Sequence, residues 1–428
     1  MHTDGCFILR KRDERKHKRK HLEVFARKRK VLRCKVFRHK HMTNSKDTER
    51  STGSRLLGMS WTHFLNDGSA NYLPGILPAI LIALHEPVSM AGAIMAALLI
   101  GQALQPFMGQ IADRLGGNSL IAIGLSGSAI GGGLLGFAHE LPVLIGLLLL
   151  IGIGNSTFHP QALAAVRSLV QKRQGLSLSL FLIGGELGRG VWPVVVSFIV
   201  VHFGLPALWI TALPAIITIP FIAKIAPKLP RRVSAGAHIE WRKHLQPFIG
   251  LVGFAGTRAF ITYGLVTFIP LLWHLHGGAL ISGASIITTL IGVGVIGNLT
   301  GGHLADRLGR RPVIVISSIL VILFVPLMLY AAGVWIWVIA AIIGMSIFSS
   351  SPVSVLIGQD IFPENRSMGS GIALGLGNGI GAMLVFLVGF WITDQTIAQV
   401  FWVMAVAGVI SALLSLIIPQ RYMVQTAE

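Results

Sequence analysis

Apolar stretches of about 20 residues follow one another along most of the chain, and they limit what it can fold into. Hydrophobic residues make up 53% of the sequence and charged residues only 12%, whereas soluble domains carry about 25% charged residues. Such stretches are typical of helices that cross a lipid bilayer. They lie at 57–84, 89–111, 118–137, 141–165, 175–201, 205–223, 246–273, 280–304, 312–331, 334–357, 367–392 and 396–418. The predicted fold class is an all-α integral membrane protein with twelve transmembrane helices.

Basic residues are distributed unevenly between the loops. Of the 17 Lys and Arg residues after position 55, fifteen fall in every second loop or at the C-terminus. The intervening loops contain none, and the last two, Arg189 and Arg258, lie within apolar stretches. Because basic loops stay on the cytoplasmic side of a membrane, both termini and the basic loop 225–245 are expected in the cytoplasm.

The sequence Ala-Asp-Arg-Leu-Gly occurs twice, at 112–116 and 305–309, which is a separation of 193 positions (306 minus 113). Each copy follows the second apolar stretch of its half of the chain. The same charged turn in the same ordinal loop predicts two copies of one six-helix bundle, related by a pseudo-two-fold axis, as in transporters. The predicted parts are a basic tail at 1–55, bundles at 56–224 and 246–418, a cytoplasmic linker at 225–245 and a tail at 419–428.

The first 41 residues are strongly basic, with 16 Lys and Arg against 4 Asp and Glu. Both cysteines, Cys6 and Cys34, lie there, so no disulfide framework is predicted for the membrane region. Three interpretations stay open: an upstream extension, if translation starts at Met42, a segment that binds anionic lipid, and a segment that binds nucleic acid. The third ranks last, and no nucleic-acid partner is expected.

Four ionisable side chains lie deep inside apolar stretches: Asp67, Glu186, Arg189 and Arg258. Helical spacing places them about 15–21 Å into a hydrocarbon core of about 30 Å, where an isolated charge costs at least about 2.5–3.5 kcal/mol. They are therefore predicted to line one hydrated central cavity. The two guanidinium groups would hold an anionic or polar substrate, and Asp67 or Glu186 would take up and release a proton. A fixed structural pair is the alternative for Glu186 and Arg189, which are three residues apart.

Weaker candidates extend this predicted cavity. His63 lies one turn before Asp67, beside Asn66, and both a proton relay and a helix–helix hydrogen bond are open for it. Tyr263 is a further polar residue on an apolar helix, and His159, next to Pro160, is interpreted as satisfying a helix kink. No metal site and no cofactor are predicted, since a proton gradient would drive transport.

The repeated turn resembles the signature of the major facilitator superfamily. Its residues are Gly109, Asp113 and Arg114 in the first copy and Gly302, Asp306, Arg307, Arg310 and Arg311 in the second. In that family the motif acts as a cytoplasmic gate latch, and the resemblance implies this role here. The first copy departs from the pattern, because Gly117 and Asn118 stand where the second has Arg310 and Arg311.

Other stretches resemble the fosmidomycin-resistance branch of that superfamily, whose members are proton-driven exporters of drugs. These stretches are 62–67, 104–109, 156–160, 184–185, 359–363 and 368–371. The fifth apolar stretch, 175–201, departs from the drug-antiporter pattern of Gly before Pro, since Trp192 precedes Pro193.

The leading functional hypothesis is a proton-coupled antiporter that expels a small organic compound, with a phosphonate-like anion as one candidate. It would act as a monomer and as a multi-pass protein of a bacterial inner membrane. A proton symporter that imports an organic acid is the alternative, and a polytopic membrane enzyme is the remote one. The chain is predicted not to be an enzyme, because no catalytic constellation or phosphate-binding loop is found at the helix ends.

Overall fold

The computed structural model describes residues 52–169, 174–231, 241–363, 369 and 371–423. The chain forms two compact units, Met1–Arg55 and Leu56–Glu428. The basic tail at 1–41, for which three interpretations are open, lies outside the described residues. Among the described residues, the helices that are both long and apolar enough to span a membrane belong to the second unit.

Eleven helices of the described part are long and apolar enough to cross a membrane. They are Met90–Leu115, Ser119–Phe137, Leu141–Leu169, Leu178–Phe203, Leu205–Ile225, Lys243–Leu275, Leu280–Leu308, Arg310–Tyr330, Trp335–Ile361, Ile372–Gly389 and Gln399–Ile417. The described residues contain no β-strand. They contain one isolated antiparallel bridge, between Gly117 and Leu229. The predicted all-α membrane class is therefore confirmed.

The first predicted stretch, 57–84, is not one continuous helix. Residues 52–71 are helical, the chain leaves the helix at Tyr72, and α2 covers Leu73–Ala83. Pro74 explains the break, because it has no backbone N–H and its ring clashes with the carbonyl one turn earlier. Tyr72 is buried at the break, and its hydroxyl donates to the carbonyl of Gly132. The total of twelve transmembrane helices stays a prediction.

Most other stretches are single or nearly single helices. These helices are α3 (Met90–Gln102), α4 (Gln105–Leu115), α5 (Ser119–Leu134), α6 (Leu141–Leu169), α7 (Gln174–Phe203), α10 (Trp241–Leu275), α11 (Leu280–Leu308), α12 (Arg310–Leu327), α13 (Trp335–Ile361), α15 (Gly377–Gly389) and α16 (Gln399–Ile417). The sixth stretch is instead a series of short segments: η2 (Leu205–Ala212), α8 (Leu213–Thr218), η3 (Ile219–Phe221) and α9 (Ile222–Ile225). A proline near the start of each of the first three segments interrupts the hydrogen-bond ladder.

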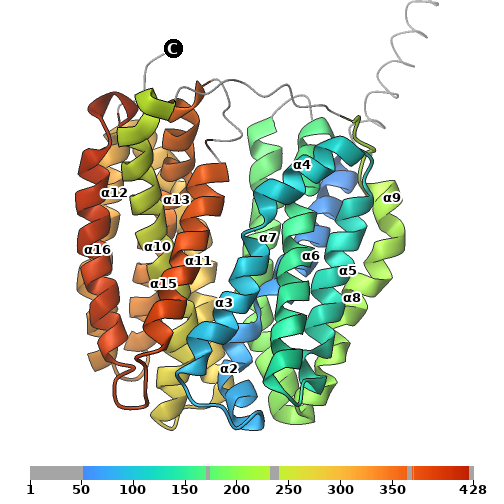
Figure 1. Ribbon diagram of the computed structural model, residues 1–428, viewed down its shortest axis with the longest axis vertical. Helices are drawn as coiled ribbons and strands as arrows, with labels where there is room; N and C mark the ends of the chain where they lie inside the picture. Colours follow the sequence, from blue (N-terminus) through green and yellow to red (C-terminus); the bar gives the residue numbers. More distant parts are fainter. Residues whose placement is uncertain (1–51, 170–173, 232–240, 364–368, 370, 424–428) are drawn as a thin grey trace, which may run out of the picture. The chain divides into compact units, whose positions relative to one another are not determined.

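Within the Leu56–Glu428 unit, the helices form two groups that meet along an interface (Figure 1). In one group, α6 packs against α3 and α5; in the other, α10 packs against α15 and α16, and α11 against α13. Across the interface, α7 packs against α11, α3 against α15, and α2 against both α10 and α11. The side chains on α7 and α10 are thereby placed near the boundary between the groups.

The repeated turn has an equivalent backbone contact in each half. Gly116 and Gly309 end their helices with φ angles of 63° and 87°, a region that favours glycine. The N–H of Gly117 donates to the carbonyl of Leu229 at 2.8 Å, and the N–H of Arg310 donates to the carbonyl of Met423 at 3.2 Å. Each turn therefore holds the segment that follows the last helix of its own half, which supports the interpretation as an internal repeat.

Two adjacent glycines of α11 differ in how closely they approach a neighbouring helix. A Cβ on Gly301 of α11 would overlap the backbone carbonyl of Ser349 in α13. A Cβ on the neighbouring Gly302 would have no atom within 4 Å. Only Gly301 is therefore required for the close approach of α11 and α13.

We expect Gly301→Ala to destabilise the protein by about 1–3 kcal/mol, the usual range for overpacking. Gly302→Ala is the matched control, and it should keep or raise the unfolding temperature because Ala is the better helix former. Thermal unfolding of both purified variants in detergent measures the difference. Equal unfolding temperatures for the two variants would contradict the packing described for α11 and α13.

Candidate functional site

Asp67 lies at the centre of a buried polar cluster. Its side chain is 0% exposed, and its Oδ2 accepts hydrogen bonds from Nη2 of Arg189 at 3.0 Å and from Nε at 3.3 Å. Asp67 belongs to helix 52–71 and Arg189 to α7, so this ion pair joins two helices. The guanidinium group supplies the positive charge that a carboxylate at this depth requires.

The other carboxylate oxygen of Asp67 is surrounded by side chains from its own helix and from α6. The amides of Asn66 and Asn155 donate to Oδ1 at 3.1 and 3.3 Å, and Nε2 of His159 lies 3.2 Å from it. The hydroxyl of Ser128 on α5 donates to Oδ1 of Asn66 and so orients that amide. Amide and guanidinium donors therefore engage both oxygens of the carboxylate.

Two histidines complete the cluster. Nε2 of His63 lies 3.4 Å from Oδ2 of Asp67 and 3.2 Å from Nε2 of His159. The Nδ1 atoms of both rings lie against backbone carbonyls, that of Phe181 at 2.8 Å for His63 and that of Asn155 at 2.9 Å for His159. Both Nε2 atoms are thereby turned toward Asp67.

Glycines of α7 allow helix 52–71 to come close enough for these contacts. A Cβ on Gly185 would overlap the ring of His63, and a Cβ on Gly188 would overlap the carbonyl of Phe64. His63 and Asp67 are four residues apart, as are Asn155 and His159, so each pair lies on one face of its helix. The cluster therefore follows from two polar i,i+4 pairs that face a glycine-rich helix.

Glu186 extends the cluster toward the boundary between the two groups of helices. Its Oε1 lies 3.7 Å from Nη1 of Arg189, and its Oε2 is buried with no hydrogen-bond partner in the part of the chain that the structure describes. Arg189 is thus shared between two carboxylates, with the closer contacts to Asp67. The predicted pair of Glu186 and Arg189 exists, but it is the longer of the two ion pairs of this guanidinium.

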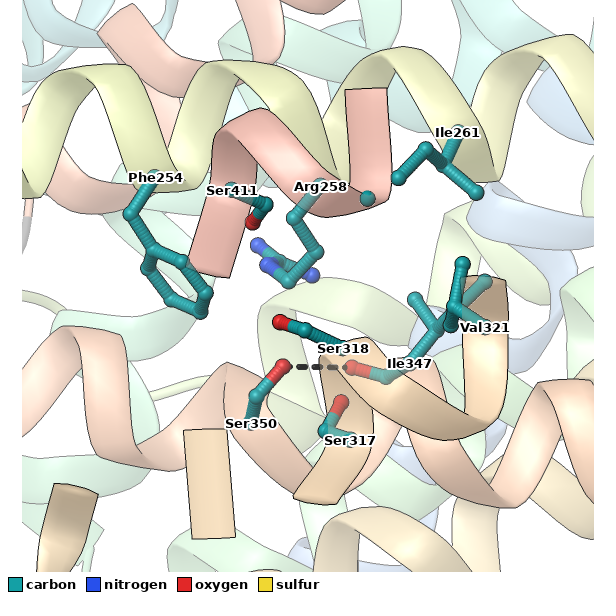
Figure 2. A pocket seen from close by; sticks show the side chains of 10 residues that line it. Phe254, Arg258, Ile261, Ser317, Ser318, Val321, Ile347, Ser350 and Ser411 are labelled. Carbon is teal, nitrogen blue, oxygen red and sulfur yellow. Dashed lines mark hydrogen bonds between the residues drawn. The ribbon is translucent and has the colours of Figure 1, made fainter. Parts of the chain in front are cut away.

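Arg258 lies on α10 in a small pocket that residues of the second half line. Figure 2 shows its guanidinium group directed toward Ser318 and Ser411, and Ser317 and Ser350 lie close by. Among the described residues, its Nε has no hydrogen-bond partner. The structure thus places Arg258 outside the Asp67 cluster, although Glu186 and Tyr263 lie within its electrostatic range.

The spacing of His63, Asp67 and His159 would by itself suit a metal ion, because their ligand atoms lie within 4.8 Å of one another. The guanidinium group of Arg189 already lies 3.0 Å from the same carboxylate. A divalent cation there would have to tolerate a fixed positive charge in a buried site, which costs free energy. The cluster fits a proton better than a metal ion.

The predicted gate residues lie at the ends of α4 and α11. Asp113, Arg114, Asp306 and Arg307 are exposed, and no ion pair of theirs occurs among the described residues. A Cβ on Gly109 would approach Pro160 at 3.6 Å, within the same half.

Arg310 and Arg311 also make their contacts within their own half. Arg310 pairs with Asp360 and donates to the carbonyl of Tyr422 at 2.8 Å. Arg311 donates to the carbonyl of Ile418 at 2.8 Å. In this conformation the two arginines hold the C-terminal segment, and the latch role implied for the whole motif stays a prediction.

Sequence reasoning did not place His159, Asn155 or Ser128 in the site. His159 had an interpretation of its own as a residue at a proline kink, and Asn155 carried none. The available signal was the i,i+4 spacing of Asn155 and His159 on an apolar helix, which repeats the spacing of His63 and Asp67.

Comparison with known proteins agrees with this architecture. The family model of the Major Facilitator Superfamily matches residues 59–373 and also 259–427. The chain belongs to the major facilitator superfamily. The predicted resemblance is confirmed, and the protein is a multi-pass membrane transporter, not an enzyme.

Two bacterial relatives of this superfamily member align over most of their length. An uncharacterized MFS-type transporter, YfnC, from Bacillus subtilis (strain 168) is 26% identical over 339 residues, which cover 75% of this chain and 82% of the relative. The fosmidomycin resistance protein of Escherichia coli (strain K12) is 24% identical over 390 residues, covering 87% and 95%. The second relative agrees with the predicted resemblance to the fosmidomycin-resistance branch.

Solved structures show the same fold. The nucleoside transporter NupG matches with a TM-score of 0.72 at 18% identity, over 85% of this chain and 99% of that chain. A bacterial homolog of the human lysosomal transporter Spinster, in an inward-facing and occupied conformation, matches with a TM-score of 0.69 at 17% identity, over 87% and 98%. The helices of the described part are thus arranged as in superfamily transporters.

The ion pair of Asp67 and Arg189 predicts non-additive effects on stability. Arg189→Gln alone should be strongly destabilising, because it leaves a buried carboxylate without its counter-charge. Breaking a fully buried ion pair costs about 3–5 kcal/mol of stability. The loss for Arg189→Gln should be smaller, since the Arg189 side chain is 35% exposed. The double variant Asp67→Asn/Arg189→Gln should be more stable than the sum of the single effects predicts.

Thermal unfolding in detergent measures this double-mutant cycle. Glu186→Gln combined with Arg189→Gln is the matched control cycle, and its coupling should be smaller because the contact is 3.7 Å long. Strictly additive effects for Asp67 and Arg189 would contradict the described pair.

Proposed function

We propose that the protein is a proton-coupled transporter whose coupling site is the Asp67 cluster, and that it acts as an efflux antiporter for small organic compounds. The observation that carries this proposal is the ion pair between Asp67 and Arg189, in which the Asp67 side chain is 0% exposed. A change of protonation in this cluster changes which hydrogen bonds Arg189 makes, and Arg189 lies on the helix that packs across the interface against α11. Proton binding is thereby linked to the contact between the two halves.

Export is supported by the kind of proteins that this chain is similar to. The fosmidomycin resistance protein covers 87% of the chain, and the multidrug efflux pump LfrA of Mycolicibacterium smegmatis is 27% identical over a shorter region of 144 residues. We take the substrate to be a small organic drug, and a phosphonate-like anion is one such compound.

The guanidinium that holds the substrate determines the mode of coupling. An anion that binds Arg189 would release Asp67, and the freed carboxylate would favour a proton, which is the coupling of a symporter. This competition favours the alternative function, a proton symporter that imports an organic acid. Antiport of an anion requires a guanidinium that no carboxylate occupies, and Arg258, with its unpartnered Nε, meets that requirement.

The contacts between the two halves support alternating access. A Cβ on Gly92, at the start of α3, would lie 2.8 Å from Cα of Gly389, at the end of α15. In the expected topology this contact lies on the outer side, whereas the exposed gate residues Asp113 and Arg114 lie on the cytoplasmic side. The arrangement fits a state that is closed outward, from which the bundles at 56–224 and 246–418 would rock about the central site.

The topology and setting complete the proposal. Helix 52–71 together with α2 would form the twelfth transmembrane span, with both termini and the linker in the cytoplasm. The protein would work as a monomer in a bacterial inner membrane, driven by the proton gradient and without a cofactor.

Energised inverted membrane vesicles test the coupling. Under antiport, an exported compound added to the vesicles should collapse the pH gradient in proportion to its concentration. Asp67→Asn should abolish this response while the variant still inserts, because it removes the charge on which Arg189 depends. A full wild-type response from Asp67→Asn would rule out the proposed coupling site.

A comparison of two arginine variants separates the two modes of coupling. Under antiport, Arg258→Ala should weaken the binding of anionic substrates more than that of neutral ones. With a panel of phosphonate antibiotics, this should appear as a loss of resistance in cells. Under symport, an organic acid should enter cells together with protons, and the Arg189→Ala variant should show the larger loss. Unchanged transport of anionic substrates by both variants would exclude both arginines as the anion site.

A further inference from the structure

We propose that His63 and His159 share one exchangeable proton between their Nε2 atoms, and that this histidine pair carries the coupled proton. The inference rests on the proposed proton coupling and names the groups responsible. It moves the proton from Asp67 or Glu186, the two carriers expected from the sequence, to two rings on helix 52–71 and α6.

Contacts with the backbone determine that one nitrogen of each ring, Nδ1, carries a hydrogen. A carbonyl oxygen can only accept, so the Nδ1 atom that contacts it must donate. His63 donates to the carbonyl of Phe181 at 2.8 Å and His159 to that of Asn155 at 2.9 Å. Both Nδ1 atoms therefore carry hydrogen, and in a neutral ring Nε2 is then a bare acceptor.

Without an added proton, the two Nε2 atoms and Asp67 would present only lone pairs to one another. The nitrogens lie 3.2 Å apart, and their distances to the carboxylate oxygens are 3.2 and 3.4 Å. Buried acceptors in contact without a hydrogen between them are costly. One proton on either Nε2 supplies a charge-assisted N–H donor to the facing Nε2, whereas two protons would set two like charges 3.2 Å apart.

The carboxylate of Asp67 is the less suitable place for this proton. Its Oδ2 already accepts two N–H groups of Arg189, and its Oδ1 accepts the amides of Asn66 and Asn155. A carboxylic O–H would have to displace one of these donors. Asp67 therefore acts as the fixed counter-charge, and the histidine pair as the proton carrier.

The charges around the histidine pair are compatible with one added proton. Asp67 faces it from helix 52–71, and Arg189 and Glu186 are contributed by α7, whereas α5 adds only the neutral hydroxyl of Ser128. On α10, Tyr263 and Arg258 lie within electrostatic range of these groups. Two carboxylates against one guanidinium leave one negative charge in the direct contact network, which one imidazolium balances.

The two rings differ in burial and access. His63 is 2% exposed and is stacked on Phe181, with ring centroids 4.2 Å apart. The side chain of His159 is 12% exposed. His63 therefore holds the proton in place, and His159, the more exposed ring, is the one through which it exchanges with the surroundings.

Nitrogen-15 spectroscopy of histidine-labelled, full-length protein in lipid tests the shared proton directly. We expect His63 and His159 to have protonated Nδ1 atoms and to show one nitrogen–nitrogen coupling across an Nε2–H···Nε2 hydrogen bond, which His63→Gln alone or His159→Gln alone should remove. His202 is the matched control, because its Nδ1 also faces a carbonyl four residues earlier, at 2.9 Å. His202→Gln should leave that coupling unchanged.

Proton-driven transport in vesicles separates this inference from the proposed function. If wild type responds to the pH gradient and His63→Gln/His159→Gln loses the response, the histidine pair carries the proton. If wild type and the double variant respond equally, the inference is wrong and the proposed function stands. If wild type does not respond, proton coupling itself is wrong.

The spectrum decides the case in which the double variant fails to insert. Bare Nε2 atoms in both rings of the wild-type protein, or hydrogen on both without a coupling between them, would overturn the shared proton. A stoichiometric divalent metal in the purified protein, measured by elemental analysis, would also overturn it.

Discussion

The neutralisation of one buried carboxylate is the constraint on which the rest of this molecule depends. Asp67 is 0% exposed within a helix that the sequence predicts to lie amid lipid, and an unpaired charge there would oppose insertion. Arg189 removes most of this cost, but only if α7 lies against helix 52–71. The glycines at 185 and 188 permit that approach. Charge compensation and backbone packing are therefore one requirement, met by the same pair of helices.

A carboxylate held in this way is also sensitive to its surroundings. The groups around Asp67 come from its own helix, from α6 and from α7, so any motion of α6 or α7 changes the compensation. Low local polarity makes such changes energetically large. The proton-coupled transport that we propose needs a site of this kind, because the proton and the substrate would have to alter the same set of contacts.

Sequence reasoning predicted the membrane class, the internal repeat and the mid-membrane charges from simple costs. Apolar length and the free energy of burying a charge do not depend on tertiary detail, so they pointed to Asp67, Glu186 and Arg189, whose side chains form one network in the structure. The direction of a side chain was not predictable in the same way. Arg258 lies at a similar depth, but it points among serines of the second half, because rotation about the helix axis decides its neighbours. His159 was missed because a proline beside it suggested a local structural role.

The contact of each repeated turn with the segment after the last helix has an evolutionary consequence. Gly117 and Arg310 recognise backbone carbonyls of Leu229 and Met423, and the side chain of Arg310 likewise binds the carbonyl of Tyr422. Contacts with backbone carbonyls constrain the length and path of the segment that carries them but not the identity of its residues. We therefore expect the linker and the C-terminal tail to drift in sequence among descendants of this gene. Insertions or deletions between the last helix of each half and its hydrogen-bonded carbonyl should be selected against.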